Sequence, residues 1–300
     1  MKTLWYLIKL VWLNVGFYSA LFVMTAVGML LVAVPGYFWQ RRVRGLDEGQ
    51  SVRRLIWFYG RAWTKLLATF VPLRVENCDS PLPRPCIVVP NHQSFFDTYC
   101  FGFTPSWDVV FAVRAWPFKM PFYGGYMRHA GYLNTESGSA VEILEESRAV
   151  LARGTSIAIF SEGTRSRDGK MGRFHGGAFH LAAETGAPVV PLCIEGTGRF
   201  LRKGSFLLRP ASIAVRVLDP IYPEKLGVER RELPLVLRHT AKARLRQALF
   251  ELRGGTLRAV PEPSLAAEPR AASPAPLGTI IPPIPTGEVK QASAGVPPSV

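Results

Sequence analysis

The sequence is poor in residues that hold metals or redox groups. It contains only four cysteines and five histidines. No two cysteines form a CxxC pair, and their spacing fits neither a metal site nor a disulfide framework, which suits a reducing compartment. No cluster of carboxylates and histidines has metal-ligand spacing either, so we expect packing thiols and no metal or redox cofactor. The cysteines are Cys78, Cys86, Cys100 and Cys193.

A serine nucleophile on a sharp strand-to-helix turn is also missing. Such a turn has the pattern Gly-x-Ser-x-Gly. The nearest string, residues 154–158, is Gly-Thr-Ser-Ile-Ala, which lacks the final glycine and runs into a predicted strand. This absence argues against chemistry through a covalent serine intermediate.

Charge is absent from residues 10–39. A bilayer core needs about 20 helical residues, so this run predicts a membrane anchor over residues 1–40. Neither the short apolar core nor the cleavage site of a signal peptide is clear. Pro35 and Gly36 leave open a straight span or a re-entrant, two-part anchor. Arginines crowd in behind the run, which favours a cytoplasmic location for the chain that follows: Arg41, Arg42, Arg44, Arg53 and Arg54.

Residues 41–72 are expected to form an amphipathic helix in the membrane interface. Aromatic side chains such as Trp57 and Trp63 are interleaved there with Arg61 and Lys65. An ordinary core-facing amphipathic helix is the alternative.

The net charge of +14 belongs to residues 1–253, because the charges beyond them cancel. A basic body suits an anionic membrane, a phosphorylated substrate or a nucleic acid, and charge alone does not choose among them.

Residues 73–253 alternate short apolar runs with helical patterns, which predicts an α/β domain. Residues 254–300 hold ten of the 25 prolines and lack an apolar period, so we expect disorder there. The predicted strands are 86–89, 109–113, 131–134, 157–160, 189–194 and 213–217. The predicted helices are 94–102, 118–129, 139–153, 177–185 and 233–252.

The first polar motif follows an apolar strand and opens a helix. It contains His92 and Asp97, with Asn91 as a candidate helix cap. Five helical steps separate two side chains by about 140°, so the pair can meet only if His92 sits on the entry turn and folds back. The carboxylate would then hold one imidazole nitrogen and leave the other free to accept a proton. A capped helix with a surface histidine is the alternative.

The second polar motif, residues 160–166, follows the strand at 157–160. Gly163 permits close backbone approach, Thr164 and Ser166 supply hydroxyls, and Arg165 supplies a fork that can hold a phosphate by two hydrogen bonds. The segment is therefore a candidate anion site. A polar turn without a ligand is the alternative.

Together with residues 174–182 and 190–192, these two motifs resemble the glycerolipid acyltransferases, specifically the 1-acylglycerol-3-phosphate acyltransferase family. The resemblance covers about residues 70–220. It implies an α/β fold with a mixed central sheet flanked by helices. It also implies transfer of an acyl group from acyl-CoA or acyl carrier protein to the free hydroxyl of 1-acylglycerol-3-phosphate, forming phosphatidic acid.

By the same resemblance, His92 would be the general base and Asp97 would orient it. The acceptor and its phosphate would be bound by the second motif, and the acyl chain would meet Val190 and Pro191. Glu162 is unusual in an anion site, so it either bonds the glycerol hydroxyls or stabilises the loop. The acceptor-binding residues would be Glu162, Gly163, Thr164, Arg165 and Ser166.

Two departures from the family pattern concern the head group. Residues 131–136 lack the arginine that the family usually has there, and His175-Gly176 stands where a lysine is common. Arg167, Lys170 and Arg173 either supply the missing charge or form a solvated basic loop. Of the other histidines, we expect His180 to be packed.

The expected partners are membrane lipids, a lysophospholipid and an acyl-CoA or acyl carrier protein, without nucleic acid. The expected location is the bacterial inner membrane, with the catalytic domain facing the cytoplasm. Three alternatives stay open: another acceptor such as a lyso-ornithine lipid, a lipid hydrolase that uses the same pair with water, and a noncatalytic basic membrane-binding protein. The sequence predicts no oligomeric state, acyl-chain length or choice between the two donors.

Overall fold

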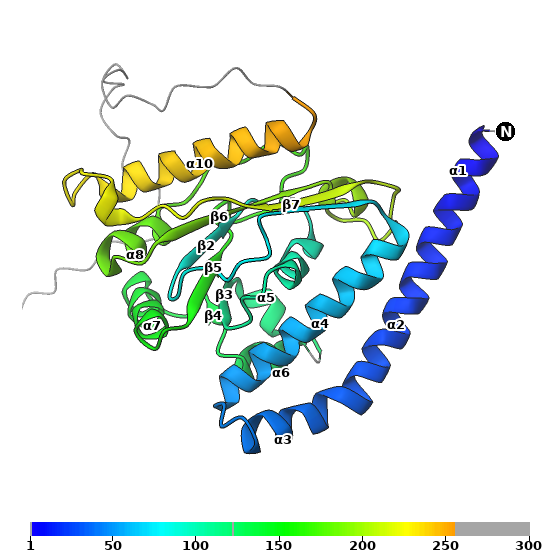
Figure 1. Cartoon of the computed structure of the whole chain (residues 1–300), viewed down its shortest axis with the longest axis horizontal. Helices are drawn as coiled ribbons and strands as arrows, with labels where there is room; N and C mark the ends of the chain where they lie inside the picture. The colour runs from blue at the N-terminus through cyan, green and yellow to red at the C-terminus, as the bar shows by residue number, and fades with distance from the viewer. Residues whose placement is uncertain (1, 122, 256–300) are drawn as a thin grey trace, which may run out of the picture. The chain divides into compact units, whose positions relative to one another are not determined.

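The computed structural model describes residues 2–121 and 123–255 (Figure 1). Most of the segment for which disorder is predicted lies outside the described residues. The first described segment is an unbroken helical run from Lys2 to Arg42. It consists of α1 (Lys2–Val11), the π-helical turn η1 (Trp12–Gly16), α2 (Phe17–Val27), the π-helical turn η2 (Gly28–Ala33) and α3 (Val34–Arg42).

Pro35 does not end this helical run. It is the second residue of α3 and directly follows the π-helical turn η2, and prolines and π-bulges bend long helices. Figure 1 shows the run bending between α2 and α3, after which α4 (Glu48–Phe70) returns beside it. Asp47 caps α4 by accepting a hydrogen bond from the Gln50 backbone N–H at 2.7 Å. Residues 4–27 form a helix of mean hydropathy 1.8 that is long and apolar enough to cross a membrane.

The body is built on a seven-stranded mixed sheet in the order β1-β7-β6-β2-β5-β3-β4. Only the β6–β7 pair is antiparallel. This agrees with the predicted mixed sheet. The strands are β1 (Leu73–Glu76), β2 (Ile87–Pro90), β3 (Val109–Val113), β4 (Leu133–Asn134), β5 (Ser156–Ile159), β6 (Val189–Glu195) and β7 (Ile213–Val217).

The sheet is buried on both faces, as its near-continuous apolar strands require. Along β2, Val88 packs into the core on one face, and Ile87 and Val89 pack into the core on the other. The first core also contains residues from α2, α4 and the 3-10 helix η3 (Phe95–Phe103). The second core contains residues from α7 (Ala140–Ala152), α8 (Gly177–Thr185) and α10 (Leu233–Leu252). The short helices are α5 (Ala115–Phe118), α6 (Tyr123–His129), α9 (Thr197–Phe200) and η4 (Pro223–Lys225).

Two element predictions were wrong in detail, and one strand was missed. The helix predicted at 94–102 is the 3-10 helix η3. The helix predicted at 118–129 is divided between α5 and α6, because Pro121 lacks an N–H and disfavours a helical residue before it. Strand β1 was not predicted. Its sequence Leu-Arg-Val-Glu alternates apolar and charged residues as an edge strand does, but the run is only four residues long.

Candidate active site

The turn that carries His92 begins where β2 ends and is fixed to the neighbouring strand β6. The Asn91 side chain accepts a hydrogen bond from the Ile194 N–H at 2.7 Å and donates one to the Ile194 carbonyl at 2.8 Å. The Gln93 amide donates to Glu195 at 3.1 Å. Asn91 is therefore not the helix cap that the sequence suggested. Ser94 is the N-cap of η3, and its hydroxyl accepts a hydrogen bond from the Phe96 N–H.

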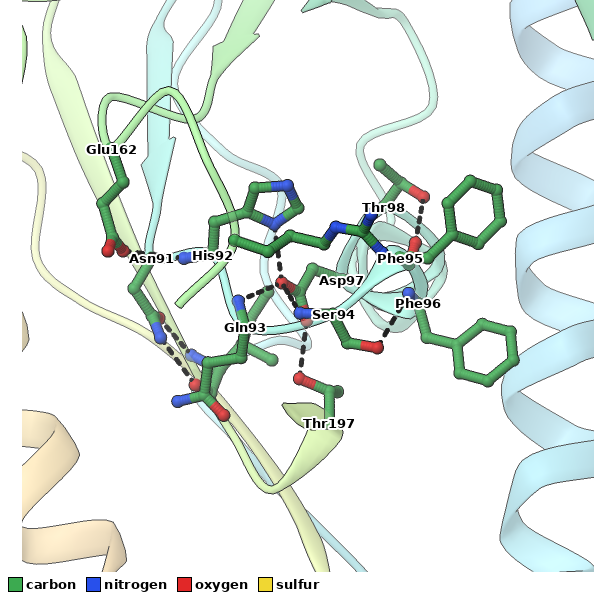
Figure 2. Close-up of polar contacts among 12 residues, drawn as sticks. Asn91, His92, Gln93, Ser94, Phe95, Phe96, Asp97, Thr98, Glu162 and Thr197 are labelled. Carbon is green, nitrogen blue, oxygen red and sulfur yellow. Dashed lines mark hydrogen bonds and ion pairs between the residues drawn. The ribbon is translucent and has the colours of Figure 1, made fainter. Parts of the chain in front are cut away.

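The structure brings the His92 ring and the Asp97 carboxylate together (Figure 2). His92 precedes the cap of η3, and its Nδ1 lies 2.8 Å from Asp97 Oδ2. Asp97 stands at the third position of η3, so the ring folds back over the first turn of the helix. This is the entry-turn geometry that their spacing of five residues requires.

Asp97 is fully buried, and both of its oxygens accept hydrogen bonds. Besides the His92 ring, Oδ2 accepts from the backbone N–H groups of Gln93 at 2.6 Å and Ser94 at 2.8 Å. Oδ1 accepts from the Thr197 hydroxyl at 2.6 Å. The carboxylate therefore cannot rotate away from the ring without leaving buried donors unpaired.

These contacts define how the His92 ring is presented. A carboxylate oxygen that already accepts two N–H groups requires a donor at Nδ1, so in the neutral ring Nε2 carries the lone pair. Nε2 forms no hydrogen bond within the described part of the chain. The Phe160 ring packs against the imidazole with 4.2 Å between centroids, and the side chain keeps 19% of its surface exposed. The ring is oriented and open to a substrate.

The second motif clamps the backbone of His92. Ser166 N–H donates to the His92 carbonyl at 2.8 Å, and His92 N–H donates to Glu162 Oε1 at 2.8 Å. The second Glu162 oxygen accepts from the Gly172 N–H at 2.7 Å. Desolvation by burial raises the pKa of Glu162, and the two N–H donors oppose that shift. Of the two roles left open for Glu162, these contacts are those of a loop-stabilising carboxylate.

Residues 163–166 of the second motif lie on the surface of this loop. Gly163 adopts φ +68°, and a Cβ atom there would lie 3.1 Å from the His175 ring. Thr164 is exposed, and Arg165 and Ser166 are partly exposed. The Arg165 guanidinium forms no hydrogen bond or ion pair with any described residue, as far as residues 2–121 and 123–255 extend. A free guanidinium on the loop that clamps the His92 backbone is suited to an anionic ligand.

Val190 and Pro191 lie farther from solvent than their expected role suggests. Both are buried in β6, opposite Val88 and Val89 of β2. They form part of the sheet that supports the His92 turn. The structure also corrects the expectation for His180, which is exposed on α8 rather than packed.

Two residues of this region were missed by sequence reasoning. Thr197 follows β6 and lies one hundred positions after the carboxylate that it bonds, so no local pattern reveals it. Arg114 follows β3 and pairs with Glu136 at 2.6 Å, just beyond β4. Strands β2, β3, β4 and β5 are parallel, so Arg114 stands at the same sheet edge as His92. A search for basic residues at strand ends would have found it.

Comparison with known proteins places this geometry among acyltransferases. A family described as Acyltransferase matches residues 73–195, which include both motifs. A chloroplast 1-acyl-sn-glycerol-3-phosphate acyltransferase from Brassica napus is 37% identical over 181 residues, covering 58% of this chain and 52% of that protein. Its counterpart from Limnanthes douglasii is 28% identical and covers 70% of this chain and 74% of its own length.

The chain thus spans about half the length of the Brassica relative. Among solved structures, the 1-acyl-sn-glycerophosphate acyltransferase of Thermotoga maritima is similar with a TM-score of 0.66 and 25% identity, covering 86% of this chain and 100% of that one. The described fold, the two motifs and these relatives agree. Residues 73–195 thus match the Acyltransferase family, and the chain is similar in sequence and in fold to 1-acyl-sn-glycerol-3-phosphate acyltransferases.

Proposed function

We propose that this protein transfers an acyl group from acyl-CoA or acyl carrier protein to the free hydroxyl of 1-acylglycerol-3-phosphate, forming phosphatidic acid. The observation that carries the proposal is the His92 ring, held by Asp97 at Nδ1 and open at Nε2, with its backbone clamped by the loop that carries Arg165. A base and an anion site within one loop cluster are what a phosphorylated alcohol requires. The names of the relatives support the same acceptor.

The reaction follows from the activated state of a thioester. His92 Nε2 removes the hydroxyl proton while the oxygen attacks the thioester carbonyl. Asp97 supports the imidazolium that forms, because it keeps the hydrogen bond to Nδ1. The tetrahedral intermediate then breaks its C–S bond, and the leaving thiolate takes up the proton. Transfer is direct, and the proposal includes no acyl-enzyme, metal or redox cofactor.

The two motifs divide the work. Thr164, Arg165 and Ser166 bind the phosphate through hydroxyls and the guanidinium, and Gly163 lets the ligand approach the backbone. Glu162 acts indirectly, by holding the loop and the His92 backbone in register. Val190 and Pro191 are buried in β6. They shape the acyl-binding surface indirectly, through their packing in the sheet.

The apolar helix indicates membrane association, and we place the protein in the bacterial inner membrane with its body in the cytoplasm. In this arrangement residues 2–42 anchor the chain and α4 lies along the interface. The basic residues behind the apolar run support the cytoplasmic side. Protease protection in inside-out and right-side-out membrane vesicles tests this orientation.

The function is tested with purified protein in detergent and a panel of donors and lysolipid acceptors, with products identified by mass spectrometry. We expect diacyl product from the phosphate-bearing acceptor, unchanged activity with a chelator, and a loss of about 10²–10⁴-fold in His92→Ala. His239→Ala is the matched control, because that histidine is exposed on α10. Free fatty acid without diacyl product would indicate a hydrolase. Activity confined to phosphate-free acceptors would refute the proposed substrate.

A further inference from the structure

A short hairpin between α9 and β7 presents apolar side chains to solvent. Leu201 and Leu208 pair as an isolated antiparallel bridge, which closes the hairpin. Phe206 keeps 90% of its surface exposed, the largest value among the exposed apolar residues of the described chain, and Leu207 keeps 44%. A phenylalanine on a closed, ordered hairpin has no packing role in the described fold. Its exposure points to a partner.

The hairpin is fastened to the N-terminal apolar helix. The Asn14 side chain accepts a hydrogen bond from the Leu208 N–H at 2.8 Å and donates one to the Leu208 carbonyl at 3.0 Å. The Tyr18 hydroxyl donates to the Phe206 carbonyl at 2.5 Å. Hairpin and helix therefore form one continuous surface.

That surface is apolar on the helix side as well. Val11, Val15 and Phe22 are exposed on the same helix that holds the hairpin. Only 11% of the most apolar 18-residue stretch of this helix is buried. The exposed tip of the hairpin thus extends an apolar surface that already has the length and composition of a membrane contact.

Basic residues flank the tip and connect it to the candidate active site. Arg202 and Lys203 are exposed in the hairpin. The Lys203 ammonium donates to the Arg165 carbonyl at 3.5 Å, and the Ser94 hydroxyl at the cap of η3 donates to the Leu201 carbonyl at 3.1 Å. An apolar tip with cationic neighbours matches the chemistry of an anionic lipid surface.

We propose that the hairpin at residues 201–208 is a second membrane contact, in which Phe206 enters the bilayer beside the N-terminal helix and Arg202 and Lys203 meet anionic head groups. This placement rests on the proposed function in one respect: a lipid acceptor would then reach Arg165 directly from the bilayer. The contact itself is independent of catalysis. The occupant is an anionic lipid bilayer rather than an acidic protein.

The test uses a fluorescent probe on the full-length chain. Burial raises the pKa of Cys78 and Cys86 to about 11 and that of Cys193 to about 12, and Cys100 is fully buried. The native thiols are therefore slow to react, and a cysteine introduced by Phe206→Cys can be labelled selectively with an environment-sensitive dye. Val141→Cys is the matched control, because Val141 is 64% exposed on α7, on the opposite face of the sheet.

With vesicles of phosphatidylcholine and phosphatidylglycerol, the Phe206→Cys dye should shift to the blue and be quenched by lipids carrying nitroxide in their acyl chains. The Val141→Cys dye should do neither. Neutralising Arg202 and Lys203 should reduce the blue shift of the Phe206→Cys dye, only when phosphatidylglycerol is present. Equal responses of the two dyes, or an unshifted Phe206→Cys dye on protein that floats with the vesicles, would overturn the proposal.

A kinetic experiment separates this proposal from the proposed function. Phe206→Asp should lower transfer to an acceptor embedded in vesicles, with transfer to a short-chain, monomeric acceptor unchanged, and Phe206→Leu should restore the former. Equal losses on both acceptors would contradict a membrane role. If the wild-type chain transfers no acyl group, the proposed function fails, and the dye measurements still decide whether the hairpin enters the bilayer.

Discussion

Replacing Asp97 by asparagine removes one charge and almost no volume from the candidate site. An asparagine Oδ1 in the place of the present Oδ2 can accept the same bonds from the His92 ring and from the N–H groups of Gln93 and Ser94. Its amide N–H then faces the Thr197 hydroxyl, which can turn to accept. The hydrogen-bond pattern survives, and only the negative charge is lost.

The magnitude follows from the geometry of the pair. A carboxylate and an imidazolium whose charges lie about 4 Å apart attract each other by about 4 kcal/mol at an effective dielectric constant of 20. This attraction exists only while the ring is protonated, so it acts on the transition state. Its loss should lower kcat about 10³-fold, since 1.36 kcal/mol corresponds to a factor of ten in rate. Folding stability should fall by only about 1–2 kcal/mol, because charged hydrogen bonds become neutral ones.

Steady-state kinetics with a lysophosphatidic acid acceptor, combined with urea unfolding of the same preparations, measures both quantities. We expect kcat to fall and KM to change little, because the proposed acceptor contacts are untouched. Asp79→Asn is the control, since Asp79 is exposed. A kcat within tenfold of the wild type would refute Asp97 as the residue that supports a charged ring.

Three further outcomes test the surrounding structure. Gly102→Ala should cost about 1–3 kcal/mol in unfolding free energy, because its Cβ would lie 2.5 Å from the Gly60 carbonyl carbon, whereas Gly60→Ala meets its nearest neighbour at 3.7 Å and should be tolerated in the same assay. Thr197→Val should cost about 1–3 kcal/mol in stability, because a buried carboxylate oxygen loses its partner, and should lower kcat in the kinetic assay. The raised pKa of Glu162 means that the folded state retains a proton that the unfolded chain has lost, so its contribution to stability should decrease as pH rises above 4.5 through the raised value, and Glu162→Gln should abolish that slope in unfolding titrations.

Elements with strong internal signals were predictable from the sequence. The ranges predicted for β3, β7, α8 and α10 coincide with those in the structure. Strand β3 is an apolar run, and β7 is apolar except for Arg216. Helix α8 is followed by Gly186, whose left-handed conformation terminates a helix. Strand β1 was missed because its alternation of apolar and charged residues covers only four positions.

The candidate site was predictable only where its contacts are local. The five-residue spacing of His92 and Asp97 restricts how they can meet, and the structure adopts the one arrangement that this spacing allows. Asn91 has the composition of a helix cap, but its side chain bonds Ile194, a partner that no local pattern contains. The same is true of Thr197. The role of a residue that joins two strands can be assigned only when the order of the strands in the sheet is known.

Strand order explains why separate stretches of the chain meet at one imidazole. Strand β2 lies between β5 and β6 and runs parallel to both, so the carboxyl ends of all three strands share one edge of the sheet. His92 follows β2, the second motif follows β5, and Thr197 follows β6. Each neighbour then fixes a different part of this site: the loop after β5 holds the His92 backbone, and the residue after β6 holds its carboxylate partner. Because three strand ends determine the position of the ring, its orientation derives from the sheet, and the short helix η3 contributes mainly the buried acid.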